Sequence, residues 1–160
     1  MSAVHPAPEL PEGAKPRPAP IPDAESEPFW SGTLDGKLLV QECSVCGQRQ
    51  LYGRSLCTNC HAAALTWVES SGQGTIYSRT IIRQNPNRSF KHMIPFVVAL
   101  IDLDDGPRLM SNVIGTPAED VHIGDRVRVV FESVSDAAAL PLFEVGARTD
   151  IRTTARWRDR

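Results

Sequence analysis

The four cysteines of this chain fall into two matched pairs, and the sequence holds no other cysteine. One pair stands in CSVCG and the other in CTNCH, each with two intervening residues. That spacing lets one tight turn aim both sulfurs at a single ion, and two such knuckles complete a tetrahedral site. The pattern therefore predicts a metal centre whose ligands are Cys43, Cys46, Cys57 and Cys60.

Zinc suits four thiolates with no redox requirement, so we expect Zn²⁺ here. A mononuclear iron site of the same geometry and an oxidised cysteine pair are the alternatives. Four thiolates leave no coordination position for water or substrate, so the expected role is structural. The ion would fold a piece of roughly 25 residues that is too small to own a core, because metal-binding free energy becomes folding free energy.

The residue after each knuckle differs between the two pairs. Gly47 follows the first, and glycine readily takes the left-handed backbone conformation that turns amides toward sulfur. His61 occupies the same place in the second knuckle, which departs from the usual glycine. We expect His61 to be a neighbour of the metal centre and not a ligand.

Length and charge limit the function classes. The chain has 160 residues and a formal net charge of −2, which fits one domain or a small module joined to a medium one. No run of about 18 apolar residues predicts a membrane-spanning helix. The start MSAVHPAPEL lacks the basic and apolar regions of a secretory signal, so we expect a cytoplasmic protein with no membrane contact. In that compartment paired cysteines more often bind metal or do redox chemistry than form structural disulfides.

The two ends of the chain differ in composition from its middle. Residues 1–22 are rich in proline and poor in large apolar residues, so we predict a disordered, extended lead. A strap along a partner subunit is the alternative. Residues 147–160 form an arginine-rich basic tail. We expect a solvated end there, with a contact arm for a partner or an anion as the alternative.

Residues 23–36 predict a short helix that ends before Gly36. Asp23 is a candidate N-cap, and acidic residues in the opening suit the positive end of a helix. The helix either begins near Pro28 or is broken there. Its aromatic residues are expected to pack, not to contact a ligand. Residues 37–68 follow as the zinc ribbon, entered by the strand-like KLLVQEC and left by LTWVES.

Residues 69–146 contain five strand-like runs, which are GTIYSRTII, PFVVALIDL, PRLMSNVIG, DRVRVVFE and LPLFEVGA. DDGP at 104–107 predicts a hairpin turn between two of them. Two arginines at 126 and 128 alternate with valines, which is the period-two pattern of a half-exposed strand. Five strands with no helix-length pattern between them predict a mainly β chain that ends in a small five-stranded OB-fold barrel.

The sequence offers no convincing catalyst. GxSxG, HExxH and P-loop motifs are absent, and SGQGTIY has too few glycines for a dinucleotide fingerprint. We therefore expect no catalytic residue in this chain. The loop QNPNRSFKHMIP carries Arg88, Lys91 and His92 between two core strands. Three potential cations make it the best place to meet an anion such as a phosphate, and plain solvent exposure is the alternative.

The order of these motifs resembles a known family. An acidic helix with FW and G precedes KLLVQECSVCG, LCTNC, LTWVESSGQGTIYSRTII, IPFVVALIDLDDGPRLMSNVIG and VHIGDRVRVVFE. Over roughly residues 22–146 the chain resembles the bacterial and archaeal family that joins a rubredoxin-like zinc ribbon to an OB-fold, long filed as a domain of unknown function. The resemblance implies that the four cysteines bind zinc. It implies CoA contacts only loosely, at Arg88, Lys91 and His92.

Members of that family are typically encoded beside thiolase-like enzymes, and some beside hydratase-like or aldolase-type enzymes that act on acyl-CoA. The resemblance implies a non-catalytic, acyl-CoA-binding accessory subunit that completes a thiolase-like or aldolase-type enzyme. The two chains would form a hetero-oligomer with acyl-CoA at the shared interface, and the ribbon and helix would grip the partner. One alternative is a subunit of an acyl-CoA hydratase-type complex.

Two alternatives from other classes follow from the same modules. A rubredoxin-like electron carrier fits the two knuckles, although the long OB segment would then be surplus. An OB-fold nucleic-acid-binding module fits both parts, since such folds bind single strands through aromatics and basic grooves. Only 6% of the residues are aromatic, and no basic–aromatic stripe stands out, so we do not expect nucleic acid as the partner.

Overall fold

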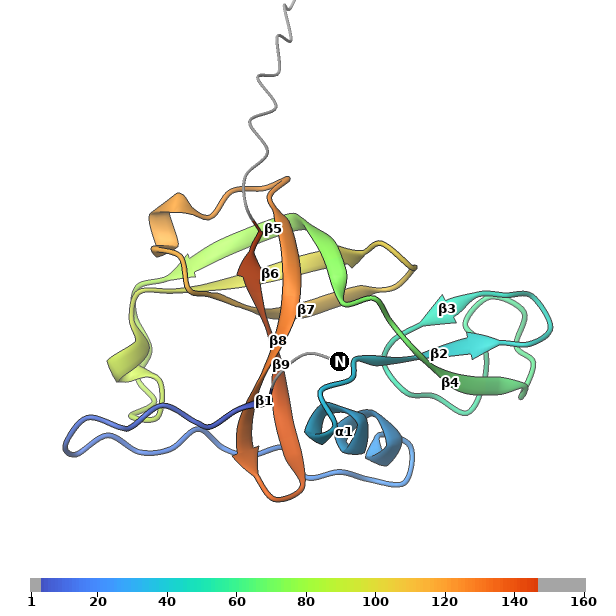
Figure 1. Cartoon of the computed structure of the whole chain (residues 1–160), viewed down its shortest axis with the longest axis horizontal. Coiled ribbons are helices and arrows are strands. Elements are labelled where there is room, and N and C mark those ends of the chain that lie inside the picture. The colour runs from blue at the N-terminus through green and yellow to red at the C-terminus, as the bar shows by residue number, and fades with distance from the viewer. Residues whose placement is uncertain (1–3, 147–160) are drawn as a thin grey trace, which may run out of the picture.

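The computed structural model describes residues 4–146, which build a small β ribbon, a short helix and a closed β barrel (Figure 1). The elements are β1 (Val4–His5), α1 (Glu27–Leu34), β2 (Leu39–Cys43), β3 (Arg49–Gln50), β4 (Leu65–Glu69), β5 (Gln73–Ile82), η1 (Lys91–Met93), β6 (Phe96–Leu103), β7 (Arg108–Ile114), η2 (Ala118–Asp120), β8 (Arg126–Ser135) and β9 (Ala138–Val145). No helix among these residues is long and apolar enough to cross a membrane.

The barrel closes through five strands. β5 pairs antiparallel with β6, and β6 pairs antiparallel with β7. β7 then runs parallel to β9, β9 pairs antiparallel with β8, and β8 returns to β5. This circuit, with its one parallel contact, is the Greek-key closure of an OB-fold. The predicted mainly β chain with a five-stranded barrel is confirmed.

Alternating burial along the strands fills the barrel. In β6 every second residue is buried, from Val97 to Leu103. In β8 the arginines at 126 and 128 are exposed while the intervening valine is buried, as the period-two pattern predicts. Phe131 and Phe143 are the largest fully buried side chains and belong to the core cluster. The barrel is therefore held by a packed apolar interior.

Helix α1 begins differently from the sequence prediction. The N-cap is Ser26, and Asp23 does not cap the helix. The Asp23 Oδ1 atom instead accepts hydrogen bonds from the backbone N–H of Ser26 at 2.8 Å and from its hydroxyl at 2.6 Å. Asp23 thus closes the turn before the helix, because the helix begins at Glu27 and Asp23 stands three residues before the N-cap. Pro28 lies in the first turn, where no intrahelical N–H bond is lost.

Helix α1 packs against the barrel through one face. Phe29 is buried, and the ring of Trp30 meets it edge-on with centroids 4.9 Å apart, so both aromatics pack as expected. The Thr33 hydroxyl accepts the backbone N–H of Ala139 at 3.1 Å, which fastens the helix to β9. The helix ends at Leu34, and Gly36 then takes a φ of 70° that glycine tolerates best.

The lead lies along the barrel in the structure. Its residues 4–5 form β1, which pairs parallel with β8 and places Val4 opposite Phe131. Further along, the guanidinium of Arg17 forms an ion pair with the carboxylate of Glu132. The predicted disorder of residues 1–22 in solution stays a prediction, as do the domain boundaries. The basic tail at 147–160 lies outside the described residues.

Candidate functional site

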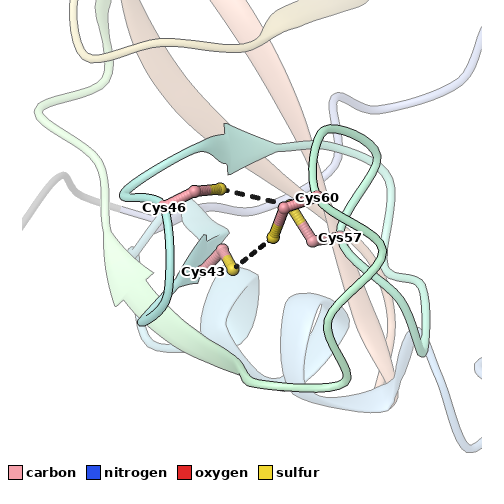
Figure 2. Close-up of side chains that lie close together, drawn as sticks. All are labelled: Cys43, Cys46, Cys57 and Cys60. Carbon is pink, nitrogen blue, oxygen red and sulfur yellow. Dashed lines mark hydrogen bonds between the residues drawn. The ribbon is translucent and has the colours of Figure 1, made fainter.

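The four cysteine sulfurs converge from two loops (Figure 2). The Sγ atoms of Cys43 and Cys60 are 3.6 Å apart, and those of Cys46 and Cys57 are 3.7 Å apart. All four ligand atoms lie within 4.8 Å of one another. Zinc bound at about 2.3 Å from each of four thiolates would require sulfur separations of about 3.8 Å. The sulfur arrangement therefore fits one tetrahedral ion.

The two knuckles share one backbone conformation despite their different sequences. Gly47 has φ 72° and its N–H donates to the carbonyl of Cys43 at 2.8 Å. His61 has φ 61° and its N–H donates to the carbonyl of Cys57 at 3.0 Å. A histidine thus occupies the left-handed conformation that the motif requires, at some cost in strain. Among the described residues the metal-ligating cluster contains the four cysteines and not His61.

Backbone amides prepare two of the thiols for ionisation. The Gln48 backbone N–H lowers the pKa of Cys46 to about 6, with help from the Asn59 side chain. The pKa of Cys57 is also lowered, chiefly by the backbone N–H of Cys60. These bonds favour the thiolate, which is the form that a metal binds.

The fourth thiol shows why the cluster needs a cation. A backbone hydrogen bond from Ala62 favours the Cys60 thiolate, yet the adjacent sulfurs of Cys46 and Cys43, together with desolvation, outweigh it. They raise the pKa of Cys60 to about 12. Four thiolates do not coexist at this distance without compensation, and a divalent ion supplies the missing charge.

Two buried glutamines hold the second knuckle against the first. Gln50 Nε2 donates to Gln41 Oε1 at 3.0 Å, and Gln50 Oε1 accepts the Thr58 backbone N–H at 2.8 Å. Gln41 Oε1 also accepts the Arg54 backbone N–H at 2.9 Å, and Gln41 Nε2 donates to the Arg54 carbonyl at 3.0 Å. No pattern in the sequence predicts this network, because a lone glutamine in a strand carries no signal of what it will bind.

The ribbon meets the barrel at the turn between β6 and β7. Asp105 accepts hydrogen bonds from the Ser70 hydroxyl at 2.9 Å and the Ser71 backbone N–H at 2.8 Å. Arg49 of β3 lies 3.5 Å from the same carboxylate. The sequence predicted a hairpin turn at 104–107, but not that its aspartate would tie the ribbon to the barrel.

The three cationic candidates of the β5–β6 loop line one cavity. Arg88, Lys91 and His92 are all exposed and border a space of about 480 Å³. The opposite wall is the lead, at residues 11–14. The structure therefore brings the three residues together, and their role as CoA contacts stays a prediction.

Comparison with known proteins identifies the family. Residues 30–66 match the ChsH2 rubredoxin-like zinc ribbon domain, and residues 67–132 match the ChsH2 C-terminal OB-fold domain. A DUF35 domain-containing scaffold protein from Methanothermobacter thermautotrophicus is 32% identical over 100 residues, covering 62% of this chain and 74% of the relative. The chain belongs to this DUF35 family of zinc ribbon and OB-fold proteins.

Two further relatives are named as parts of enzymes. A probable enoyl-CoA hydratase alpha subunit from Thermomonospora curvata is 29% identical over 136 residues, which cover 84% of this chain but only 41% of that protein. A solved chain described as the Ltp2-ChsH2(DUF35) aldolase superposes with a TM-score of 0.72 at 25% identity. The match covers 79% of this chain and 98% of that one.

The metal of the centre follows from the family and the geometry together. The matched ribbon domain is rubredoxin-like and zinc-binding, and the four sulfurs are placed for one tetrahedral ion. The centre therefore carries structural zinc. Cys43 and Cys57 are buried while Cys46 and Cys60 reach the surface, but all four coordination positions are taken by sulfur. Zinc with four cysteine ligands stabilises the fold of the ribbon and has no open coordination position for a substrate.

Proposed function

We propose that this chain is a non-catalytic accessory subunit that docks on, and completes, a thiolase-like or aldolase-type acyl-CoA enzyme. The observation that carries the proposal is the match to the Ltp2-ChsH2(DUF35) aldolase, which spans 98% of that solved chain. The same zinc ribbon, helix and barrel would then form a hetero-oligomer with the catalytic chain. We place the complex in the cytoplasm.

The chain's own contribution is binding and shape. The enclosed zinc centre fixes the ribbon, and the ribbon with α1 presents a rigid surface to the partner. Arg88, Lys91 and His92 surround a cavity large enough for part of a cofactor. Arginine and lysine form charge-assisted hydrogen bonds to phosphate oxygens. We therefore assign these three residues to the phosphate-bearing portion of acyl-CoA at the shared interface, while the partner supplies the catalytic groups.

A hydratase-type partner is the second candidate. It is favoured by the relative from Thermomonospora curvata, which is named a probable hydratase alpha subunit and aligns with 84% of this chain. The two candidates differ in the reaction of the partner and agree on the role of this chain.

A nucleic-acid role gains no support from the barrel surface. Three exposed arginines on its strands are each paired with a carboxylate, at Arg108–Asp102, Arg126–Asp104 and Arg128–Glu144. A phosphate backbone would have to displace these carboxylates, whereas nucleic-acid-binding faces present unpaired cations.

The proposal is tested by purifying the tagged full chain from its native host in mild salt and identifying the proteins that come with it. We expect one stoichiometric acyl-CoA enzyme of the thiolase, aldolase or hydratase class. Reconstitution then measures turnover of the partner alone, of this chain alone and of both. The expected result is turnover that requires the partner and rises when this chain is added. Vigorous acyl-CoA turnover by the purified single chain would contradict an accessory role.

A variant of the zinc centre supplies the control. Cys57→Ala removes a buried ligand, so we expect it to lose the partner and the gain in turnover. Val45→Ala alters an exposed side chain of the first knuckle and should retain both. Equal behaviour of the two variants would mean that the ribbon takes no part in docking.

A further inference from the structure

Two adjoining cavities lie between the lead and the barrel. We call the first the mouth; it holds about 480 Å³ and is bordered by Arg88, Lys91 and His92. We call the second the chamber; it holds about 330 Å³. Apolar residues make up most of the chamber's lining, among them Leu10, Met93, Ile114, Val134 and Leu142. The charged side chains of Glu9, Arg17 and Glu132 also border it. Pro11 and His92 border both cavities, so the mouth opens next to the mainly apolar chamber. In the mouth the cations of Arg88 and Lys91 face a single carboxylate, that of Glu12.

Residues 4–17 of the lead, which we call the strap, cross both cavities and are fixed at each end to the same strand. At one end β1 pairs with β8 and places His5 opposite Glu132. At the other end Arg17 forms its ion pair with Glu132, and only 10% and 16% of these two side chains are exposed. A shielded ion pair resists removal of either partner, because the remaining charge would be buried alone. The strap is therefore clasped and not simply laid on the barrel.

The strap covers the chamber without filling it. Its prolines fix the backbone in extended conformations and carry no N–H that must find a partner, so the segment can span open space. A single tight turn at 11–14 redirects it, with the Ala14 N–H donating to the Pro11 carbonyl at 3.0 Å. Leu10 is the largest apolar side chain of the strap, yet 41% of it is exposed. A segment that plugged the chamber would bury that side chain.

We propose that mouth and chamber form one site for an elongated ligand with a phosphate-bearing end and an apolar arm, and that the strap is its roof. This inference rests on the proposed function and extends it: in a CoA thioester the phosphates would meet Arg88 and Lys91, and the arm would enter the chamber. Each cavity lies within the range of about 300 to about 1,000 Å³ that is usual for small-molecule sites. The phosphates and the acyl chain stand at opposite ends of such a ligand, with the pantetheine between them, as the cations of the mouth and the apolar lining of the chamber stand at opposite ends of the site.

The test compares acetyl-CoA with decanoyl-CoA as probes, titrated calorimetrically into the full chain. We expect decanoyl-CoA to bind at least about tenfold tighter, because its methylene groups leave water for the chamber. The double variant Arg88→Ala/Lys91→Ala should weaken both ligands by a similar factor of roughly tenfold or more, since it removes phosphate contacts only. Arg54→Ala changes the same kind of charge on the ribbon and serves as its control.

The roof is tested by releasing the strap without leaving a lone buried charge. Arg17→Met/Glu132→Gln releases the strap at its Arg17 end, and we expect it to cancel most of the advantage of decanoyl-CoA over acetyl-CoA. Both residues also border the chamber, but the changes make its lining less charged, which by itself would favour decanoyl-CoA. A smaller advantage therefore reports the loss of the strap. Lys15→Met is the control, because Lys15 belongs to the strap but borders neither cavity. Hydrogen exchange of β6 and β7, with which the strap does not pair, confirms that the barrel is intact in each variant. If decanoyl-CoA keeps its full advantage over acetyl-CoA after the strap is released, the strap does not cover the bound acyl chain.

The remaining outcomes separate this inference from the proposed function. If the full chain binds neither probe but still enhances an acyl-CoA enzyme, the two-cavity site is wrong and the accessory role stands. If it binds both probes equally well, the mouth stands and the chamber is wrong. If it neither binds a probe nor recruits such an enzyme, the proposed function itself fails.

Discussion

The ribbon and the barrel reach a stable fold by different physical means. The ribbon sheet has strands of five, two and five residues, and the interior of its tip consists of sulfurs and glutamine amides. The barrel strands have seven to ten residues and bury a continuous apolar core. A segment too small to bury enough apolar surface needs another source of free energy, and here zinc provides it.

The boundary between the two regions lies inside the ribbon. Leu38 and Val40, at the root of the ribbon, belong to the same apolar cluster as the barrel core, and Phe29 of α1 joins them. Among the described residues, only Leu51 of the tip packs against that cluster, and the two knuckles themselves contribute no member to it. The root should therefore depend on the barrel, whereas the tip should depend on the metal.

Removal of the metal should produce the largest difference in stability between the tip and the barrel. Binding of structural zinc contributes about 10 kcal/mol or more in small domains, so chelation of zinc or Cys57→Ala should unfold the tip completely. We expect backbone amides at residues 43–62 to lose protection in hydrogen exchange resolved by mass spectrometry. Amides of β6 and β8 should keep theirs, because the barrel core makes no use of the ion.

Two measurements accompany that experiment. Metal analysis of the purified chain should return one zinc and no iron, and an iron-coloured protein would contradict the assignment of zinc. Val45→Ala, an exposed change in the same knuckle, should leave exchange of the tip unaltered. Parallel loss of protection in barrel and tip would show that the two regions fold as one unit.

A cavity in the barrel core tests the reverse dependence. Phe143 is a fully buried member of the core cluster, so Phe143→Ala should cost about 3 to 5 kcal/mol of unfolding free energy. The root of the ribbon should be destabilised with the barrel, since it shares that cluster. Urea unfolding followed by circular dichroism measures the loss. Retained zinc affinity in the folded variant would confirm that the tip is independent, and a large loss of affinity would contradict it.

The glutamine network gives an intermediate effect confined to the tip. Gln50→Ala removes the hydrogen bonds of Gln50 to the Thr58 N–H, to Gln41 Oε1 and to the Leu56 carbonyl, while Gln41 Oε1 keeps the Arg54 N–H. Each lost hydrogen bond is worth about 0.5 to 1.5 kcal/mol. We expect faster zinc loss to a competing chelator with an unchanged barrel. Gln48→Ala is the matched control, because the Gln48 side chain is exposed and donates only to the Arg49 carbonyl. Equal rates of zinc loss in the two variants would mean that the glutamine network does not stabilise the zinc centre.

The features that the sequence predicted are those that depend on the spacing of residues close together in the chain. Two Cys-x2-Cys knuckles predict a tetrahedral metal centre, and the alternation of arginine and valine in 126–129 predicts a half-exposed strand. The five strands and the position of Gly36 at the helix end could be read in the same way. Each of these patterns depends only on neighbours in the chain, which is why they survive without a structure.

The features that the sequence did not predict depend on partners far apart in the chain. Glu132 contacts Arg17 across 115 positions, and Ser70 contacts Asp105 across 35. A local signal for the first contact exists: the outward positions of β8 change from arginine at 126 and 128 to Val130, which is buried. That change indicates that something covers the outer face of β8 there, although it does not say which segment.

The smallest expected effect lies in the difference between the two knuckles. His61 holds a φ of 61° where the first knuckle has glycine, and a non-glycine residue in that conformation costs about 1 to 2 kcal/mol. His61→Gly relieves this strain but adds freedom to the unfolded chain, so the net gain should be a few tenths to about 1 kcal/mol. The measurement is zinc retention against a chelator, with Gly47→Ala as the opposite change at φ 72°. Slower zinc loss in His61→Gly and faster loss in Gly47→Ala would show that the two knuckles need the same backbone. Faster loss in His61→Gly would instead mean that the imidazole stabilises the centre.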